Sequence, residues 1–134
     1  MKKKISILGS TGSIGVTTLN ILNKKKNLFE INLLSADKNL NLICKQIKIY
    51  KPNFFIINNF KVFQKVKTKI KKTKTRIVLS NNFRYKSLTK SDITLSAIPG
   101  LDGLTPTIEM IKKSNKLLIA NKESIICGWD IIKK

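Results

Sequence analysis

A glycine-rich segment near the start of the chain constrains the fold more than any other feature. Gly9-Ser10-Thr11-Gly12-Ser13-Ile14-Gly15 follows the apolar run 5–8 and precedes the amphipathic stretch 16–22. In a strand–turn–helix corner of this kind, glycines let the backbone approach an anion, and the helix N-terminus presents free N–H groups and a positive dipole end. The sequence therefore predicts a phosphate-binding corner, with a dinucleotide as the expected ligand.

The glycine spacing is GxxGxxG, which differs from the commoner GxGxxG. Its position between an expected strand and an expected helix is the context that phosphate binding requires. A P-loop is excluded because no Gly-Lys-Ser/Thr follows. The alternative is a glycine turn that serves only the packing of the strand against the helix.

Apolar runs and amphipathic stretches alternate along the whole chain. We expect strands over 4–8, 30–36, 53–58, 76–79, 92–97 and 116–120, and helices over 13–25, 39–50, 60–72, 105–114 and 124–132. Strands that alternate with helices favour a parallel sheet with right-handed crossovers. The predicted fold class is α/β, a doubly wound, Rossmann-like parallel sheet in three α/β/α layers, with residues 1–134 as one NAD(P)-binding domain.

The formal charge of +20 also raises the possibility of a nucleic-acid-binding protein, since clustered cations release counterions from a phosphate backbone. Arg76 and Arg84 are the only arginines, however, and arginine is the usual base-reading residue. Lysine, asparagine and isoleucine are abundant, and their A/T-rich codons in a biased genome would give the same composition. We expect no specific nucleic-acid partner.

Neither a membrane segment nor a disulfide is expected. No run of about 18 apolar residues occurs, and the apolar stretch after Met1-Lys2-Lys3-Lys4 is too short for a signal peptide. Cys44 and Cys127 stand alone, without a neighbouring metal-ligand or redox motif. Two free thiols indicate a reducing compartment, and we expect a cytoplasmic protein.

The expected second strand ends in a segment that suits the adenosine ribose of a dinucleotide. Within Ser35-Ala36-Asp37-Lys38-Asn39, the Asp37 carboxylate can accept from a ribose 2′-hydroxyl, which favours NAD, whereas Lys38 can meet a 2′-phosphate, which favours NADP. The two residues argue in opposite directions. The alternative is a solvated turn in which Asn39 caps the next helix.

Three segments together resemble one family, 1-deoxy-D-xylulose 5-phosphate reductoisomerase. They are 9–15, the stretch Ser-Ala-Ile-Pro-Gly-Leu-Asp-Gly-Leu-Thr-Pro-Thr at 96–107, and Ala-Asn-Lys-Glu-Ser at 120–124. The resemblance extends from residue 4 to residue 128 but covers only the N-terminal part of the family's architecture. It implies an NADPH-binding domain of an enzyme of non-mevalonate isoprenoid biosynthesis.

The resemblance also implies roles for individual positions. Thr11, Gly12, Ser13 and Ile14 match the pyrophosphate loop, Lys38 and Asn39 match positions near the adenosine 2′-phosphate, Asn121 and Glu123 match further cofactor contacts, and Lys122 matches a residue that touches the sugar-phosphate substrate. Asp37 departs from the family pattern, which commonly has glycine there. Two like charges about 4 Å apart repel by several kcal/mol at a partly screened site, so we expect a weakened preference for NADP.

Members of this family convert 1-deoxy-D-xylulose 5-phosphate to 2-C-methyl-D-erythritol 4-phosphate, as homodimers that use NADPH and Mg²⁺ or Mn²⁺. The seven acidic residues of this chain are scattered and it has no histidine, so we expect no metal ligands and no catalytic residues within it. From the resemblance we expect the family's catalytic and C-terminal domains to be absent from this chain. We therefore predict a cofactor-binding part that is inactive alone. A stand-alone nucleotide-binding module and a degenerate remnant are the alternatives.

Overall fold

The structure, a computed structural model, describes residues 1–120 and 122–133 of the chain. In this part, six parallel strands form one sheet. The strands are β1 (Lys3–Leu8), β2 (Phe29–Ala36), β3 (Phe54–Ile57), β4 (Arg76–Leu79), β5 (Ser91–Ser96) and β6 (Ser114–Ile119). The helices are α1 (Ser13–Asn23), α2 (Leu40–Tyr50), α3 (Phe60–Lys69), α4 (Leu104–Ile111) and α5 (Lys122–Ile132), with short 3₁₀ turns η1 (Ser80–Asn82), η2 (Tyr85–Ser87) and η3 (Leu101–Gly103).

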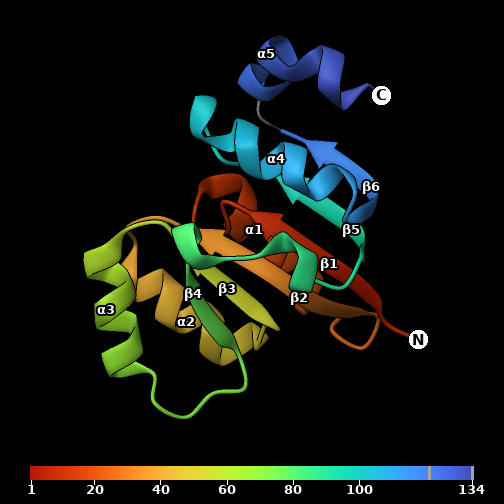
Figure 1. The fold of residues 1–134 in the computed structure, drawn as a ribbon. Helices are drawn as coiled ribbons and strands as arrows, with labels where there is room; N and C mark the ends of the chain where they lie inside the picture. Colours follow the sequence, from red (N-terminus) through yellow and green to blue (C-terminus); the bar gives the residue numbers. More distant parts are fainter. Residues whose placement is uncertain (121, 134) are drawn as a thin grey trace.

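The strand order is β4-β3-β2-β1-β5-β6, and every neighbouring pair is parallel (Figure 1). The chain winds outward from β1 to β4 and then returns to β5 on the other side of β1. The order of winding therefore reverses between β1 and β5, which is the switch point where ligands bind in folds of this type. The predicted doubly wound α/β class is confirmed.

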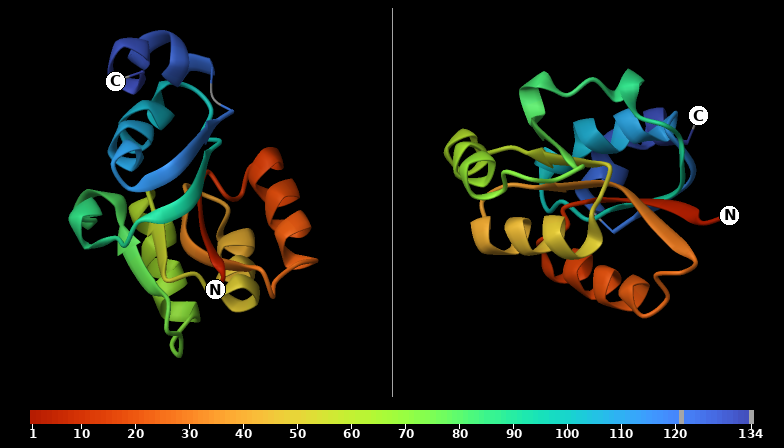
Figure 2. Two further views of the ribbon diagram at one scale, coloured as in Figure 1. Left: turned by 90° about the vertical axis from the view of Figure 1, so that its right-hand side faces the viewer. Right: turned by 90° about the horizontal axis from the view of Figure 1, so that it is seen from below.

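Two apolar clusters cover the two faces of the sheet. On one face, Leu19 of α1, Ile43 and Ile47 of α2 and Val66 of α3 pack against buried strand residues. On the other, Met110 of α4 joins Phe83 and Leu88 from the connection between β4 and β5, packed against Leu8, Leu33 and Ile56. Figure 2 shows α1 and α2 on one side of the sheet and the 3₁₀ segment on the other. The second face is thus covered partly by irregular chain rather than by helix.

Several helix boundaries differ from the sequence-based expectation. The helix expected over 105–114 ends at Ile111, because Ser114 pairs with Ser91 and its hydroxyl bonds to that of Thr94, so strand pairing takes this residue. The helices expected to reach Lys25 and Lys72 end at Asn23 and Lys69, and the last helix begins two residues early, at Lys122. None of these shifts alters the order of the elements.

A buried polar network fixes the long connection between β4 and β5. Asn32 in the middle of β2 is fully buried and donates through Nδ2 to the carbonyl of Thr89 and to Oγ of Ser91. The Ser91 hydroxyl also bonds to that of Ser6 at 2.6 Å. These bonds satisfy side chains that would otherwise be costly to bury, and they place β5 beside β1. In the described ranges, the structure contains no helix with the length and apolarity that crossing a membrane requires.

Candidate cofactor-binding site

The carboxyl ends of four strands meet at one edge of the sheet and enclose a pocket of about 240 Å³. It is lined by residues at the carboxyl end of β2 and by residues that follow β1, β2, β3 and β5: Gly9, Thr11, Gly12, Ser35, Ala36, Asp37, Asn58, Ala97, Ile98 and Pro99. The pocket lies at the switch point between β1 and β5. It therefore occupies the place where a dinucleotide binds in a doubly wound sheet.

Gly9 makes the turn out of β1 possible. Its φ is +83°, and a Cβ on it would lie 2.8 Å from the carbonyl oxygen of Ala97, so any side chain there would be strained and would clash with the end of β5. The amides of Gly9 and Ser10 both donate to the carbonyl of Ser35, at 3.1 and 2.8 Å, and the Gly9 amide also donates to Ser35 Oγ at 3.1 Å. The entrance to the turn is thus held by β2 and by β5.

The amides that come next take no part in these bonds to β2. Helix α1 begins at Ser13, Gly12 precedes it in an extended conformation without a side-chain cap, and the first bond that closes the helix runs from the Val16 amide to the Gly12 carbonyl at 2.9 Å. The amides of Ser13 and Ile14 come before that bond, where a helix has no acceptor of its own. No acidic residue stands in the first turn. This end of α1 therefore favours an anion.

The three glycines of the motif have different surroundings. A Cβ on Gly15 would lie 2.7 Å from Ser10 Cα, so α1 packs directly onto the turn there. A Cβ on Gly12 would meet nothing closer than the Gly9 carbonyl oxygen, at 3.8 Å. The fold itself requires glycine at Gly9 and Gly15, but at Gly12 the missing side chain leaves an open approach to the backbone. This arrangement fits a pyrophosphate resting on the turn.

Of the two charged residues expected at the ribose, Asp37 lines the pocket just after β2, and Lys38 is the next residue in the chain. Asp37 and Lys38 are exposed, and the only ion pair among residues 1–120 and 122–133 joins Lys133 to Asp130, at 3.2 Å. The charges of Asp37 and Lys38 are therefore available to a ligand. Asn39 caps α2, its Oδ1 accepting from the Leu42 amide at 3.1 Å. The capping alternative is thus observed for Asn39, and it leaves the side-chain amide nitrogen for other contacts.

The segment after β6 is described only in part. Asn121 lies outside the described residues, as does the side chain of Glu123, so their expected cofactor contacts stay predictions. Lys122 is exposed and is the first residue of α5 rather than the end of a strand. The Ala120 amide donates to the Ser96 carbonyl at 2.9 Å, which continues the pairing of β6 with β5 up to this segment.

Sequence reasoning missed several residues of the pocket. Ser35 holds the glycine turn through two acceptors, while Asn58, Ala97 and Ile98 form the opposite wall. The only signal for these residues in the sequence was their position, since each lies at the carboxyl end of a strand or just after it, and these ends share one edge of the sheet. The missing information was the strand order, which places β5 beside β1.

The described residues contain no group of three or more histidine, cysteine, aspartate or glutamate side chains that could hold a metal ion. Cys44 is half-buried and Cys127 is exposed, and both are free thiols. The divalent cation that the resemblance implies therefore has no ligand cluster among the described residues.

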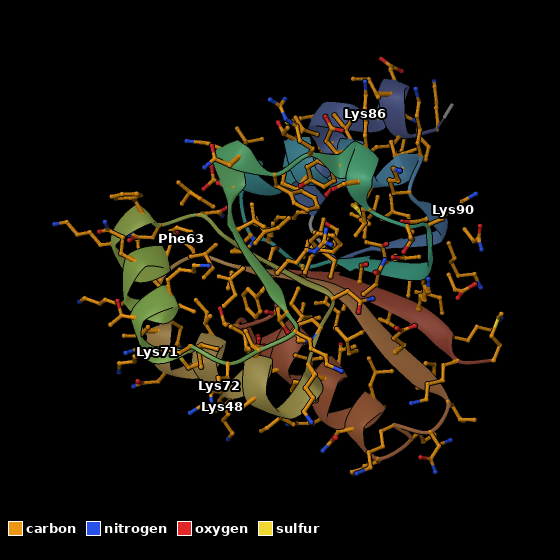
Figure 3. The ribbon with its side chains drawn as sticks, turned by 60° about the horizontal axis from the view of Figure 1, so that its bottom comes forward. Lys48, Phe63, Lys71, Lys72, Lys86 and Lys90 are labelled. Carbon is orange, nitrogen blue, oxygen red and sulfur yellow. The ribbon has the colours of Figure 1, made fainter. Side chains whose placement is uncertain are left out.

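A larger and more open hollow, of about 870 Å³, lies near the ends of α2 and α3, away from the glycine turn. Six lysines line it: Lys48, Lys51, Lys69, Lys71, Lys72 and Lys74. Figure 3 shows Lys48, Lys71 and Lys72 together there, apart from Lys86 and Lys90. Residues 38–91 contain no acidic residue at all. The lining includes no arginine and no aromatic side chain, so this hollow has charge for polyanions but no groups for reading or stacking on bases.

A parallel sheet whose winding reverses at a glycine turn, with the residue before helix α1 lining a pocket there, is the arrangement of the Rossmann class of dinucleotide-binding proteins. The sequence profile of the 1-deoxy-D-xylulose 5-phosphate reductoisomerase family matches residues 5–128. The chain belongs to this family, to whose N-terminal part it corresponds.

Relatives with this enzyme name include proteins from Pelagibacter ubique and Buchnera aphidicola. The first is 41% identical over 98% of this chain and the second 40% identical over 98%, and the chain spans 35% and 34% of their lengths. The chain therefore spans about a third of the curated relatives that it matches.

Two solved structures have the same fold. The reductoisomerase from Zymomonas mobilis in complex with NADPH superposes with a TM-score of 0.89 at 24% identity, covering 99% of this chain and 36% of that one. A DOX-P reductoisomerase in complex with NADPH, fosmidomycin and magnesium superposes with a TM-score of 0.86 at 25% identity, covering 98% of this chain and 33% of that one.

Proposed function

We propose that this chain is the NADPH-binding part of a 1-deoxy-D-xylulose 5-phosphate reductoisomerase. The observation that carries the proposal is the corner at 9–15, where the amides of Gly9 and Ser10 bond to Ser35, while Gly12 stands open before the uncapped start of α1. The family membership and the NADPH complexes of the solved relatives support the same ligand.

Within this proposal the residues form three groups of cofactor contacts and one substrate contact. The pyrophosphate contacts are Thr11, Gly12, Ser13 and Ile14; the adenosine contacts are Asp37, Lys38 and Asn39; further cofactor contacts are Asn121 and Glu123, with Lys122 directed to the sugar phosphate. Backbone amides and lysine charge suit phosphate oxygens, because they donate without adding negative charge. In the bound state NADPH supplies a hydride, and the role of these residues is to bind the cofactor and fix its orientation.

We assign the whole protein the conversion of 1-deoxy-D-xylulose 5-phosphate to 2-C-methyl-D-erythritol 4-phosphate. It takes a sugar phosphate and Mg²⁺ or Mn²⁺, acts as a homodimer and works in the cytoplasm. Within this proposal the metal ligands and the catalytic residues belong to the remainder of such an enzyme. Ile126 and Trp129 of α5 are 75% and 52% exposed and offer apolar contacts for the remainder of such an enzyme.

The proposal is tested by titrating the chain with NADPH while following backbone amide resonances and the heat of binding. We expect the resonances of 11–14 to shift and the chain to show no reductoisomerase turnover. If those resonances stay unmoved at saturating NADPH, the proposal fails. Turnover by this chain alone would contradict the assignment of the catalytic ligands to other residues.

Binding to DNA separates the proposal from the nucleic-acid alternative. The lysine-lined hollow predicts retention that is not sequence-selective and that falls steeply with salt, because counterion release drives it. Sequence-selective retention at physiological salt would favour the alternative over the cofactor function.

A further inference from the structure

Gln46 is a polar residue in the buried face of α2. Its neighbours on that face, Ile43 and Ile47, belong to the apolar core, and Gln46 itself is only 3% exposed. An apolar side chain there would continue the packing without the free-energy cost of removing an amide from water. The position therefore calls for an explanation in terms of what the amide contacts.

Both ends of the Gln46 amide contact one residue of the glycine turn. The Ser10 hydroxyl donates to Gln46 Oε1 at 2.7 Å, and Gln46 Nε2 donates to the Ser10 carbonyl at 2.9 Å. Ser10 is fully buried, and its own amide donates to the Ser35 carbonyl at 2.8 Å. Every polar atom of Ser10 is thus tied to α2 or β2.

Ser10 directly precedes Thr11 and Gly12, which line the pocket. Fixing its carbonyl fixes the orientation of the peptide that leads into Thr11, and the following turn has no other described side-chain bond to hold it before α1 starts. A rotation of that peptide would redirect the amides of Thr11 and Gly12. Holding the amides in place before the ligand arrives reduces the ordering that binding requires.

We infer that Gln46 is a positioning residue for the pyrophosphate loop, acting through Ser10 and not through contact with the cofactor. This inference rests on the proposed NADPH function. A residue far from the glycine motif in the sequence thus helps to set the geometry of that motif. It also explains why α2 keeps a glutamine in an apolar face.

The test compares Gln46→Leu with Thr75→Val in the full chain. Thr75 is also buried and its hydroxyl also donates to a carbonyl, that of Pro52 at 2.6 Å, but it lies beside the lysine-lined hollow rather than the glycine turn. We expect Gln46→Leu to weaken the binding of NADPH and of NADH by the same factor, about tenfold or more. Thr75→Val should change neither by more than about twofold.

The equal loss for the two coenzymes is a signature of the inference. They differ only at the 2′-phosphate, which the pyrophosphate loop does not contact, so a positioning role leaves their affinity ratio unchanged. Amide hydrogen exchange at 11–13 should also accelerate in Gln46→Leu and not in Thr75→Val. Unchanged coenzyme affinity in folded Gln46→Leu, or a changed ratio of the two affinities, would overturn the inference.

Ser10→Ala provides a milder variant if Gln46→Leu does not fold. It removes the hydroxyl but keeps the bond from Gln46 Nε2 to the Ser10 carbonyl, so we expect a smaller, few-fold loss for both coenzymes. No loss in Ser10→Ala, with wild-type exchange at 11–13, would count against the inference. Failure of the wild-type chain to bind NADPH would instead contradict the proposed function, so the two failures are distinguishable.

Discussion

Replacing Gly12 and Gly15 with alanine, one at a time, separates what the fold requires from what the ligand requires. The same methyl group is added within one turn of the same corner. At Gly15 it would overlap the backbone of Gly9 and Ser10, with Ser10 Cα at 2.7 Å. At Gly12 the nearest atom would be 3.8 Å away, which is an ordinary contact.

The two substitutions should therefore differ in stability. Gly15→Ala forces backbone to move, because the atoms it meets are not a flexible side chain, and overpacking of this kind costs about 1–3 kcal/mol. For a domain of this size we expect Tm to fall by about 4–12 °C. In Gly12→Ala, a gain of about 0.4–1 kcal/mol from the less flexible unfolded chain offsets a similar loss at the helix cap. Its Tm should stay close to that of the wild type.

The effect on NADPH binding should not follow the effect on stability. In Gly12→Ala the added methyl group occupies the open approach to the backbone. This variant should therefore bind NADPH at least tenfold more weakly, about 1.4 kcal/mol, while the chain stays folded. Calorimetry on both variants, with thermal unfolding by circular dichroism, measures the two effects. Wild-type NADPH affinity in Gly12→Ala would refute the reasoning that the pyrophosphate lies over this turn. A wild-type Tm in Gly15→Ala would refute the packing argument.

Three further predictions concern single side chains. Asp37 is exposed, so water screens its repulsion of a 2′-phosphate to about 1 kcal/mol per unit charge rather than several. Asp37→Gly should therefore raise the ratio of NADPH affinity to NADH affinity about fivefold or more in paired titrations. An unchanged ratio would contradict this. Asn39→Ala and Asn59→Ala each remove a helix cap worth about 1 kcal/mol, so both should lower Tm. Only Asn39→Ala should weaken NADPH binding. Equal NADPH affinity in the two variants would show that Asn39 is not a cofactor contact. Burial, with a smaller contribution from Glu109, raises the pKa of Tyr85 to about 12. The unfolded chain then loses this proton first, so the free energy of unfolding should fall by about 1.4 kcal/mol per pH unit above pH 10, up to the pKa in the folded state. Tyr85→Phe should make that decline shallower, and an identical decline in urea unfolding of both proteins would exclude Tyr85 as its source.

The elements and the motif were accessible to sequence reasoning because their signals are local. The apolar run before Gly9 and the amphipathic stretch after Gly15 specify a strand and a helix within a few residues of each other. Asn39 was recognisable as a cap from its position before α2, and the structure shows that bond. The alternation of strands with helices fixed the parallel class. Boundaries were less accessible, as Ser114 shows, because a distant strand decides whether that residue continues a helix.

The amino-acid sequence by itself determined a strand–glycine–helix corner, an alternating α/β pattern and an excess of lysine. Only the tertiary structure decided that β5 lies beside β1, that Ser35 and Gln46 hold the turn, and that six lysines gather away from it. The physical reason is the separation along the chain between the residues that interact. Helix and strand propensity act between neighbours in the chain, whereas pairing of strands and burial of polar side chains depend on partners tens of residues away, which the folded core alone brings into contact.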